Sequence, residues 1–416
     1  MTQLERLRAL LAVVLESNPF YSAKLGAAGV GPELQSLDEF VRTVPFTTKQ
    51  ELVEDQKTHP PYGSNLSYPL TCYSRYCQTS GTSGAPLRWL DTAESWAAML
   101  DCWVRVFEAA GVGQEDRIFF PFSFGPFLGF WTAFEAATRM GALVIPGGGM
   151  RSAARLQAIL DNEVTVLCST PTYALHLAEV ATGEQIDLSA AKVRRIIVAG
   201  EPGGSVPATR ALIENLWPGA RVADHHGMSE VGPVTYECPV RPGVLHVIEA
   251  SYFAEVIDAD TLARVGPGGS GELVLTNLKR LGSPLLRYRT RDFVRRAEAL
   301  RCGCGSEELA LEGGILGRTD DMLVVRGVNV YPGAVEEILR SCGNIREFQI
   351  EVFTQRALPE LNLRIEPGLP HGEVPALIHR IESALRNAFA LRVSVTCAEP
   401  GTLPRFESKA RRWVKR

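Results

Sequence analysis

Residues 194–216 read RRIIVAGEPGGSVPATRALIENL, and this stretch decides the fold class. Its first part, Arg194–Ala199, predicts a buried strand, and Val206–Leu216 has the period of a helix. Outward from it the pattern repeats, with strands expected at 117–122, 142–146 and 164–169 and helices at 92–110, 129–139, 153–160 and 172–181. Strands that alternate with helices of about 10–15 residues predict βαβ units, and therefore a parallel sheet with helices on both faces.

The pattern changes twice towards the C-terminus. After Gly232, short alternating strands at 252–257, 271–276 and 292–296 are separated by glycine-rich turns, which predicts a smaller antiparallel sheet. After Arg318, strands at 322–325, 347–352 and 361–365 and helices at 332–341 and 373–389 predict a compact α+β unit. We therefore expect an α/β fold with a large N-terminal domain, residues 1–317, and a small α+β C-terminal domain, residues 318–416.

Composition excludes several classes of protein. The chain has 416 residues, with 43 Lys and Arg against 47 Asp and Glu, so its formal net charge is −4 and nucleic acid is not an expected partner. No apolar run approaches the ~18 residues of a membrane span. Residues 1–20 carry Glu5 and Arg8 among leucines, which predicts an amphipathic helix rather than a signal peptide. Nine irregularly spaced cysteines do not indicate a disulfide framework, so we expect a cytoplasmic protein with reduced thiols.

Several familiar motifs are absent or misplaced. Residues 266–271 fit the pattern G-x-G-x-x-G, but the segment after them predicts a strand, so we interpret them as a β-turn rather than a dinucleotide site. The sequence contains no Walker loop, no H-E-x-x-H and no G-x-S-x-G.

Five polar segments remain as candidates for a site. Residues 79–86 read TSGTSGAP, whose glycines and hydroxyl groups could gather N–H and O–H donors around a polyphosphate. A solvent-exposed loop has the same composition, so both interpretations stay open. The other four segments each have a purely structural interpretation. Residues 199–202 and 224–230 could be turns at strand ends, residues 287–292 a surface ion-pair strip, and residues 317–321 a linker. They are also candidates for a site, because loops at the carboxyl ends of parallel strands bind ligands in α/β proteins.

Taken in order, four motifs resemble the acyl-adenylate-forming superfamily: TSGTSGAP, HHGMSEVGP, RYRTRD and GRTDDMLVVRGVNVYP. Within it the chain is most similar to phenylacetate–CoA ligases and related aryl-CoA ligases, a similarity carried also by SNPFYSAKL, VPFTTKQEL, GALVIPGGG, VLCSTPTYAL and GTLPRFESKARR. The resemblance implies an enzyme that uses Mg²⁺ and ATP to convert a carboxylic acid, expected to be aromatic, into acyl-AMP. It implies that coenzyme A then takes the acyl group as a thioester.

The resemblance also implies roles for individual residues. Lys409 would bridge the substrate carboxylate and the α-phosphate, and Glu230 would hold Mg²⁺ against the phosphates. The residues expected at ATP or AMP are Thr79, Ser80, Gly81, Thr82, Ser83 and Gly84 at the phosphates, Gly200, Glu201, Pro202, His225, His226 and Gly227 at the adenine, and Asp292 and Arg318 at the ribose. A solvated basic tail is the alternative for Lys409, because other basic residues surround it.

The acyl and coenzyme A sites follow from the same resemblance. Four side chains are expected to line the acyl pocket, although ordinary core residues would look the same: Phe124, Phe127, Tyr173 and Met228. Lys409 and the thiol must reach the same acyl group in turn. We therefore expect the C-terminal domain to rotate about Asp320 and to present Arg326 and Gly327 to coenzyme A, with an inert linker as the alternative.

The chain departs from the family pattern at three places. Ala85 stands where the family has a basic residue, and His226 stands where it has an adenine-stacking Tyr. The segment 119–130, which helps to form the acyl pocket in the family, looks shorter. The identity of the acid is therefore the least transferable property.

Four residues form a second candidate site. Cys238 and His246 flank a turn, and Cys302 and Cys304 form a C-x-C pair further along the chain. Together they could close a tetrahedral Cys₃His site for a structural Zn²⁺ ion. Buried cysteines that pack as small hydrophobic residues are equally compatible with the spacing. Some phenylacetate-ligase-like proteins carry a similar set.

Other functions stay open at this point. The acyl acceptor could be the phosphopantetheine of a carrier protein, or an amine, instead of coenzyme A. An inactive nucleotide-binding regulatory protein is a further alternative, against which the presence of Lys409, Glu230 and Asp292 argues. We expect a monomer or a homodimer.

Overall fold

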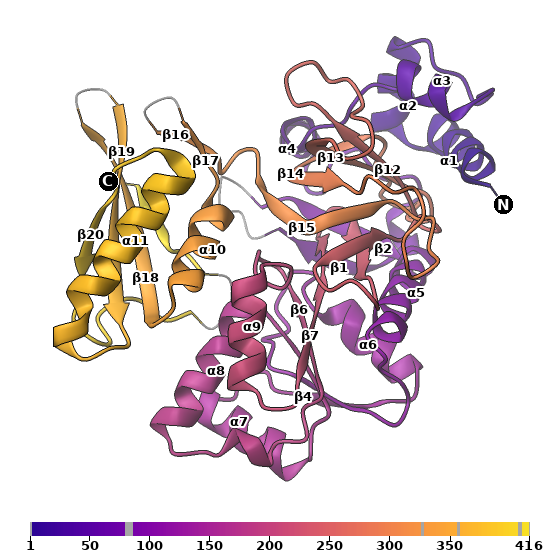
Figure 1. Cartoon of the computed structure of the whole chain (residues 1–416). Helices are drawn as coiled ribbons and strands as arrows, with labels where there is room; N and C mark the ends of the chain where they lie inside the picture. Colours follow the sequence, from indigo (N-terminus) through magenta and orange to yellow (C-terminus); the bar gives the residue numbers. More distant parts are fainter. Residues whose placement is uncertain (1, 80–85, 326–327, 356–357, 407–409, 416) are drawn as a thin grey trace.

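The computed structural model describes residues 2–79, 86–325, 328–355, 358–406 and 410–415 (Figure 1). Two large sheets, two short two-stranded sheets and the helices packed with them make up a large N-terminal unit. A smaller unit, which holds α10 (Pro332–Cys342) and the yellow elements of Figure 1, stands beside the N-terminal unit. Its helix α10 contacts α9 (Pro207–Leu216) of the N-terminal unit.

The predicted parallel sheet is confirmed. Its five strands lie in the order β4-β3-β5-β6-β7, and every neighbouring pair is parallel. The strands are β3 (Arg117–Phe120), β4 (Leu143–Pro146), β5 (Val166–Ser169), β6 (Arg195–Ala199) and β7 (Arg221–His225). The sequence predicted β3, β4, β5 and β6, and the observed ends of these strands lie within two residues of the predicted ends. It gave no bounds for β7.

The two faces of this sheet are buried in different cores, because successive strand residues point to opposite faces. Phe120 packs into one core and Phe119 into the other. The helices of the first core are α5 (Ala93–Ala109) and α6 (Trp131–Arg139), and those of the second are α7 (Ser152–Asp161), α8 (Pro171–Gly183) and α9. Because helices pack on both faces, the strands and the loops at their carboxyl ends are held in place.

The antiparallel sheet has six strands in the order β10-β11-β15-β14-β13-β12. They are β10 (Thr235–Glu237), β11 (Val244–Val247), β12 (Tyr252–Ile257), β13 (Ser270–Asn277), β14 (Tyr288–Arg296) and β15 (Ala310–Arg318). The sequence located β12, β13 and part of β14. It did not predict β10, β11 or β15. In β15, Gly313 and Gly314 take positive φ angles of 75° and 66° beside an irregular register with β14. As expected, residues 266–269 form a turn that leads into β13.

The first ninety residues build a helical layer and a hairpin. The helices are α1 (Gln3–Ser17), α2 (Pro19–Ala27), α3 (Leu37–Thr43) and α4 (Lys49–Thr58), and the hairpin is β1 (Tyr73–Gln78) with β2 (Arg88–Thr92). The amphipathic helix predicted at the start of the chain is α1, whose Leu7 and Leu11 are buried in one cluster with Phe253 and Leu286. This cluster ties the helical layer to the antiparallel sheet.

The C-terminal unit has its own core. A four-stranded sheet in the order β20-β19-β18-β21 packs with α10 and α11, and a small hairpin of β16 and β17 precedes them. The remaining elements are β16 (Leu323–Val325), β17 (Val328–Val330), β18 (Ile345–Gln355), β19 (Leu358–Pro367), α11 (Val374–Phe389), β20 (Ser394–Cys397) and β21 (Trp413–Lys415). The expected α+β unit is therefore present, while the exact boundary at Gly317–Asp321 stays a prediction.

Among the described residues, no helix combines the length and the apolar character that crossing a membrane requires. None of the nine cysteines, all of which are described, forms a disulfide.

Candidate active site and metal centre

The hairpin of β1 and β2 carries the predicted phosphate loop. The Thr79 N–H donates to the Leu87 carbonyl at 2.9 Å, and the Leu87 N–H donates to Thr79 Oγ1 at 3.0 Å, so two hydrogen bonds join the residues on either side of the predicted loop. Thr79 is buried. Ser80, Gly81, Thr82, Ser83 and Gly84, as well as Ala85, lie outside the described residues.

Glu230, the predicted magnesium ligand, is buried and lies beside a lysine that the sequence did not single out. Its Oε1 is 3.1 Å from the Lys49 ammonium nitrogen. Lys49 is the first residue of α4, and Thr48 caps that helix by accepting from the Glu51 N–H. The signal for Lys49 was its place in the matched segment VPFTTKQEL.

A buried ion pair fixes the backbone around Glu230. Arg280 donates to both carboxylate oxygens of Asp91, each at 2.6 Å, and to the carbonyls of Ser229 and Glu230 at 3.0 and 2.8 Å. The Arg280 and Asp91 side chains are 3% and 0% exposed. Asp91 belongs to β2, so one guanidinium joins the strand that leaves the phosphate loop to the segment that carries Glu230.

The residues predicted at the ribose come together. Asp292 in β14 pairs in register with Arg318 in β15, and Arg318 Nη1 lies 3.3 Å from Asp292 Oδ1. His226 Nε2 lies 3.2 Å from Asp292 Oδ2. Arg318 also donates to both oxygens of Asp320, at 2.9 and 3.0 Å, and these carboxylates raise its pKa against the opposing effect of burial. The arginine therefore connects the last strand of the N-terminal unit to the predicted hinge.

The predicted adenine segments follow β6 and β7. His225 is buried, its ring centroid is 4.3 Å from that of Trp103, and burial lowers its pKa to about 3, so the imidazole is neutral. A Cβ on Gly227 would lie 2.8 Å from the Gly232 carbonyl oxygen, which explains the glycine between His226 and Met228. Gly200 takes a φ of 95°, which lets the chain turn sharply after β6.

The Glu201 side chain makes two hydrogen bonds that its predicted role at the adenine does not explain. Its Oε1 accepts from the Thr172 N–H at 2.9 Å, and its Oε2 accepts from the Ala410 N–H at 2.8 Å. Burial raises the pKa of Glu201, and these hydrogen bonds oppose the rise. Thr172 is the second residue of α8, whereas Ala410 belongs to the C-terminal unit and directly follows Lys409 in the sequence. Lys409, Arg326 and Gly327 themselves lie outside the described residues.

The residues predicted for the acyl pocket separate into two groups. Phe124 and Met228 pack against the first core, and Phe124 lies in an aromatic cluster, 5.1 Å from Phe122 and 4.9 Å from Trp131 between ring centroids. Phe127 is 37% exposed and contacts Phe122. The structure does not bring Tyr173 to them.

Tyr173 belongs to the second core, on the opposite face of the parallel sheet. Its hydroxyl lies 3.0 Å from Ser152 Oγ and accepts from Arg155, which also donates to the Gly147 carbonyl. The interactions of Tyr173 therefore support the loop after β4.

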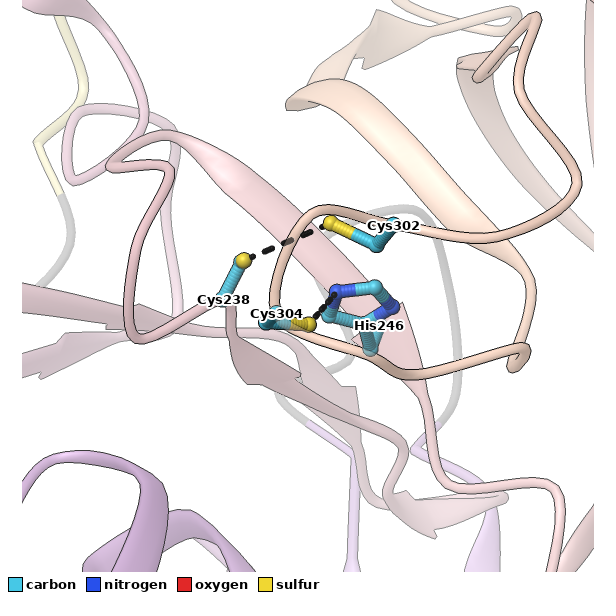
Figure 2. Close-up of side chains that lie close together, drawn as sticks. All are labelled: Cys238, His246, Cys302 and Cys304. Carbon is cyan, nitrogen blue, oxygen red and sulfur yellow. Dashed lines mark hydrogen bonds between the residues drawn. The ribbon is translucent and has the colours of Figure 1, made fainter.

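The four predicted metal ligands come together (Figure 2). Their ligand atoms all lie within 4.8 Å of one another, with 3.6 Å between Cys238 Sγ and Cys302 Sγ and 3.5 Å between Cys304 Sγ and His246 Nε2. Tetrahedral Zn²⁺ with bonds of about 2.3 Å to sulfur and 2.0–2.1 Å to nitrogen would put its ligand atoms about 3.5–3.8 Å apart.

The surroundings of His246 favour metal binding through Nε2. Its Nδ1 lies 3.4 Å from the Glu308 carbonyl oxygen, which can accept a hydrogen bond only from an Nδ1–H; in that tautomer Nε2 carries the lone pair that a metal ion needs. The ring of Tyr236 stacks on His246 with centroids 5.3 Å apart and fixes its orientation. The donor set therefore fits a closed, structural zinc site.

Comparison with protein families identifies the class of protein that this site defines. The family model of the AMP-binding enzyme matches residues 67–278, and that of the AMP-binding enzyme C-terminal domain matches residues 327–416. The chain belongs to the AMP-binding enzyme family.

Comparison with individual proteins shows which kind of ligase within the family the chain resembles. The chain is 32% identical to a phenylacetate–coenzyme A ligase of Thermus thermophilus, over 97% of this chain and 93% of that protein. It is 30% identical to the phenylacetate–coenzyme A ligase of Escherichia coli, over 98% of this chain and 92% of the relative. The resemblance stated from the motifs is thereby confirmed.

Solved structures add a comparison of conformations. A 2-hydroxyisobutyryl-CoA ligase in the postadenylation state, in complex with 2-HIB-AMP, matches with a TM-score of 0.94 at 28% identity, covering 100% of this chain and 89% of that one. The same ligase with 2-HIB-AMP and CoA in the thioesterification state matches with a TM-score of 0.74, covering 99% of this chain and 88% of that one. The described arrangement of the two units thus resembles the postadenylation state.

Proposed function

We propose that this chain is an AMP-forming ligase that activates a carboxylic acid as acyl-AMP and transfers the acyl group to coenzyme A. The observation that carries the proposal is the similarity over nearly the full length to coenzyme A ligases, together with the two-unit arrangement of an acyl-AMP complex. In the first step a carboxylate oxygen attacks the α-phosphorus of ATP and pyrophosphate leaves. In the second step the thiol sulfur attacks the acyl carbon, and AMP leaves with that oxygen.

Residues of this chain supply the positioning for the first step. Asp292 accepts hydrogen bonds from the ribose hydroxyls, and Arg318, beside it at 3.3 Å, lies against the ribose and the phosphate. Lys409 places a cation between the carboxylate and the α-phosphate, which otherwise repel each other. A buried carboxylate at Glu230, close to the phosphate hairpin, fits a Mg²⁺ ion, which when bound neutralises phosphate charge.

The acid is proposed to be aromatic. The aromatic cluster of Phe122, Phe124 and Trp131, which packs against the same core as Met228, supports a planar, apolar substrate. The relatives named phenylacetate–coenzyme A ligases support it too. Phe124 takes a positive φ of 51°, a strained conformation for a bulky residue that is typical of functional segments. The competing candidate is a small hydroxy acid, because the structural neighbour is a 2-hydroxyisobutyryl-CoA ligase.

A screen of pyrophosphate release tests this choice. Phenylacetate, benzoate, 2-hydroxyisobutyrate and octanoate are each supplied with Mg·ATP, and acyl-CoA is then identified by mass spectrometry. We expect the two aromatic acids to have the highest kcat/KM. A preference for octanoate or for 2-hydroxyisobutyrate would contradict the aromatic assignment. Product on a carrier protein or an amine, but none on coenzyme A, would reassign the acceptor.

We also propose that Cys238, His246, Cys302 and Cys304 bind one structural Zn²⁺ ion. The ligand distances support it, and the four side chains together supply the four ligands of a tetrahedral ion. Because such a site couples binding to folding, chelation should lower the melting temperature more than it lowers activity at moderate temperature. Elemental analysis that finds well under one zinc per chain, after purification under reducing conditions without chelator, would reject the site.

A further inference from the structure

The contact between Glu201 and Ala410 spans the two units next to the proposed catalytic lysine. We propose that Glu201 is a positioning residue for acid activation, whose carboxylate latches the C-terminal unit in the arrangement in which acyl-AMP forms. The inference rests on the proposed function and assigns Glu201 a role beyond lining the adenine.

The carboxylate is anchored firmly on the N-terminal unit. Pro171 and Thr172 are the first residues of α8, where backbone N–H groups lack partners within the helix and the helix dipole favours a negative charge. Glu201 Oε1 accepts one of these orphan N–H groups at 2.9 Å. Its other oxygen is then directed at the C-terminal unit, where it accepts the Ala410 N–H at 2.8 Å.

Two further side chains of the C-terminal unit contact helix α8. Arg412 Nη1 lies 3.3 Å from Thr172 Oγ1, while its Nε donates to Glu347 within its own unit at 2.6 Å. Arg405 pairs with Glu179, at 3.0 Å. Because residues 405, 410 and 412 flank Lys409, the contacts on α8 and on Glu201 restrain the chain on both sides of it.

The latch stabilises only one arrangement of the two units. The chain matches the postadenylation state of the 2-hydroxyisobutyryl-CoA ligase with a TM-score of 0.94, and the thioesterification state with only 0.74, although the coverage is nearly the same. An interaction present in one state and absent in the other shifts the equilibrium between them by its own free energy. Loss of the Glu201 contact should therefore slow acid activation and spare thioester formation.

Glu201→Gln is the direct test, because glutamine keeps the size of the side chain but has one acceptor oxygen for two N–H donors. Pyrophosphate release is measured with phenylacetate and Mg·ATP, and thioester formation is measured separately from supplied phenylacetyl-AMP and coenzyme A. We expect activation to fall roughly 10-fold to 100-fold, as for loss of one hydrogen bond to a charged group. The second step should keep its rate.

Glu214→Gln is the matched control. Glu214 lies on α9, accepts the Val222 N–H at 3.0 Å and pairs with Arg221, so it also accepts a backbone N–H, but both of these partners lie in the N-terminal unit. Both steps should proceed normally in this variant.

A second variant keeps the test decisive if Glu201→Gln folds poorly. Ala410→Pro removes the same hydrogen bond from the other unit. It should also lose activation and keep thioester formation, and the double variant should lose no more than the stronger single variant. Normal activation in both single variants, equal loss of both steps in both, or a raised KM for ATP with unchanged kcat would overturn the latch. Absence of both steps in the wild-type chain with every acid of the screen would instead refute the proposed function.

Discussion

Replacing Arg280 by Met should destabilise the N-terminal unit and weaken the binding of Mg·ATP. The variant leaves Asp91, whose side chain is fully buried, without a counter-charge, and it leaves the carbonyls of Ser229 and Glu230 without their donor. Removing one partner of a buried ion pair costs about 3–5 kcal/mol. We expect a loss of this size in the free energy of unfolding of the N-terminal unit, measured by urea titration.

Measuring the KM for Mg·ATP separates an effect on the Glu230 segment from general destabilisation. Because Arg280 holds the backbone of Glu230, the KM for Mg·ATP should rise several-fold under conditions in which the variant is still folded. Arg287→Met is the matched control. Arg287 also makes a buried, bidentate pair with Glu255, at 2.9 Å, and donates to the Val44 carbonyl, but within the described part of the chain its side chain makes no hydrogen bond to the Glu230 segment.

The double variant Arg280→Met with Asp91→Leu removes both charges and should recover part of the stability, because no buried charge is then left alone. A loss below about 1 kcal/mol in Arg280→Met, the size typical of exposed ion pairs, would refute the reasoning. So would equal rises in the KM for Mg·ATP in the Arg280 and Arg287 variants.

Three further predictions follow from the site. Lys409→Ala should lower acyl-AMP formation roughly 10²–10³-fold and leave thioester formation from supplied acyl-AMP intact, and near-normal pyrophosphate release would contradict the role of Lys409. Asp320→Pro should restrict rotation of the C-terminal unit, so that activation survives and thioester formation is lost, whereas normal thioester formation would dismiss the hinge. The pKa of His225 is lowered from 6.5 to about 3, so its contribution to stability is complete above pH 6.5 and is lost as the pH falls towards 3. Urea titrations should therefore show that the stability of the wild type relative to His225→Phe falls by up to about 1.4 kcal/mol per pH unit below pH 6, and parallel pH profiles would be evidence against this.

The parallel sheet was predictable because its strands are short and continuously apolar and its helices have a clear period. In β6, Ile196, Ile197 and Val198 are all buried, and Pro207 marks the start of the next helix. In contrast, β15 contains two adjacent glycines and is a strand only because β11 and β14 pair with it. Such tertiary pairing overrides local propensity.

The sequence predicted the residues of the candidate site that belong to matched motifs. It did not predict contacts between residues that are far apart in the sequence. Asp292 and Arg318 meet because their strands are neighbours in the antiparallel sheet. Arg280 and Asp91 are separated by 189 positions, and Glu201 and Ala410 by 209, so no local pattern indicates either contact. Tyr173 lies in the second core and Phe124 packs against the first, and a motif in the sequence does not show which face of the sheet a side chain takes.

Transfer of an oxygen isotope tests the central claim most directly. An acid that the screen identifies as a substrate is labelled with ¹⁸O at both carboxylate oxygens and incubated with Mg·ATP, coenzyme A and the protein. If a carboxylate oxygen attacks the α-phosphorus, that oxygen stays with the nucleotide when the thiol takes the acyl group. Mass spectrometry should therefore find one ¹⁸O in the released AMP, the other ¹⁸O in the thioester carbonyl of the acyl-CoA, and none in the pyrophosphate. Formation of ADP and phosphate, or of AMP without the label, would contradict the account.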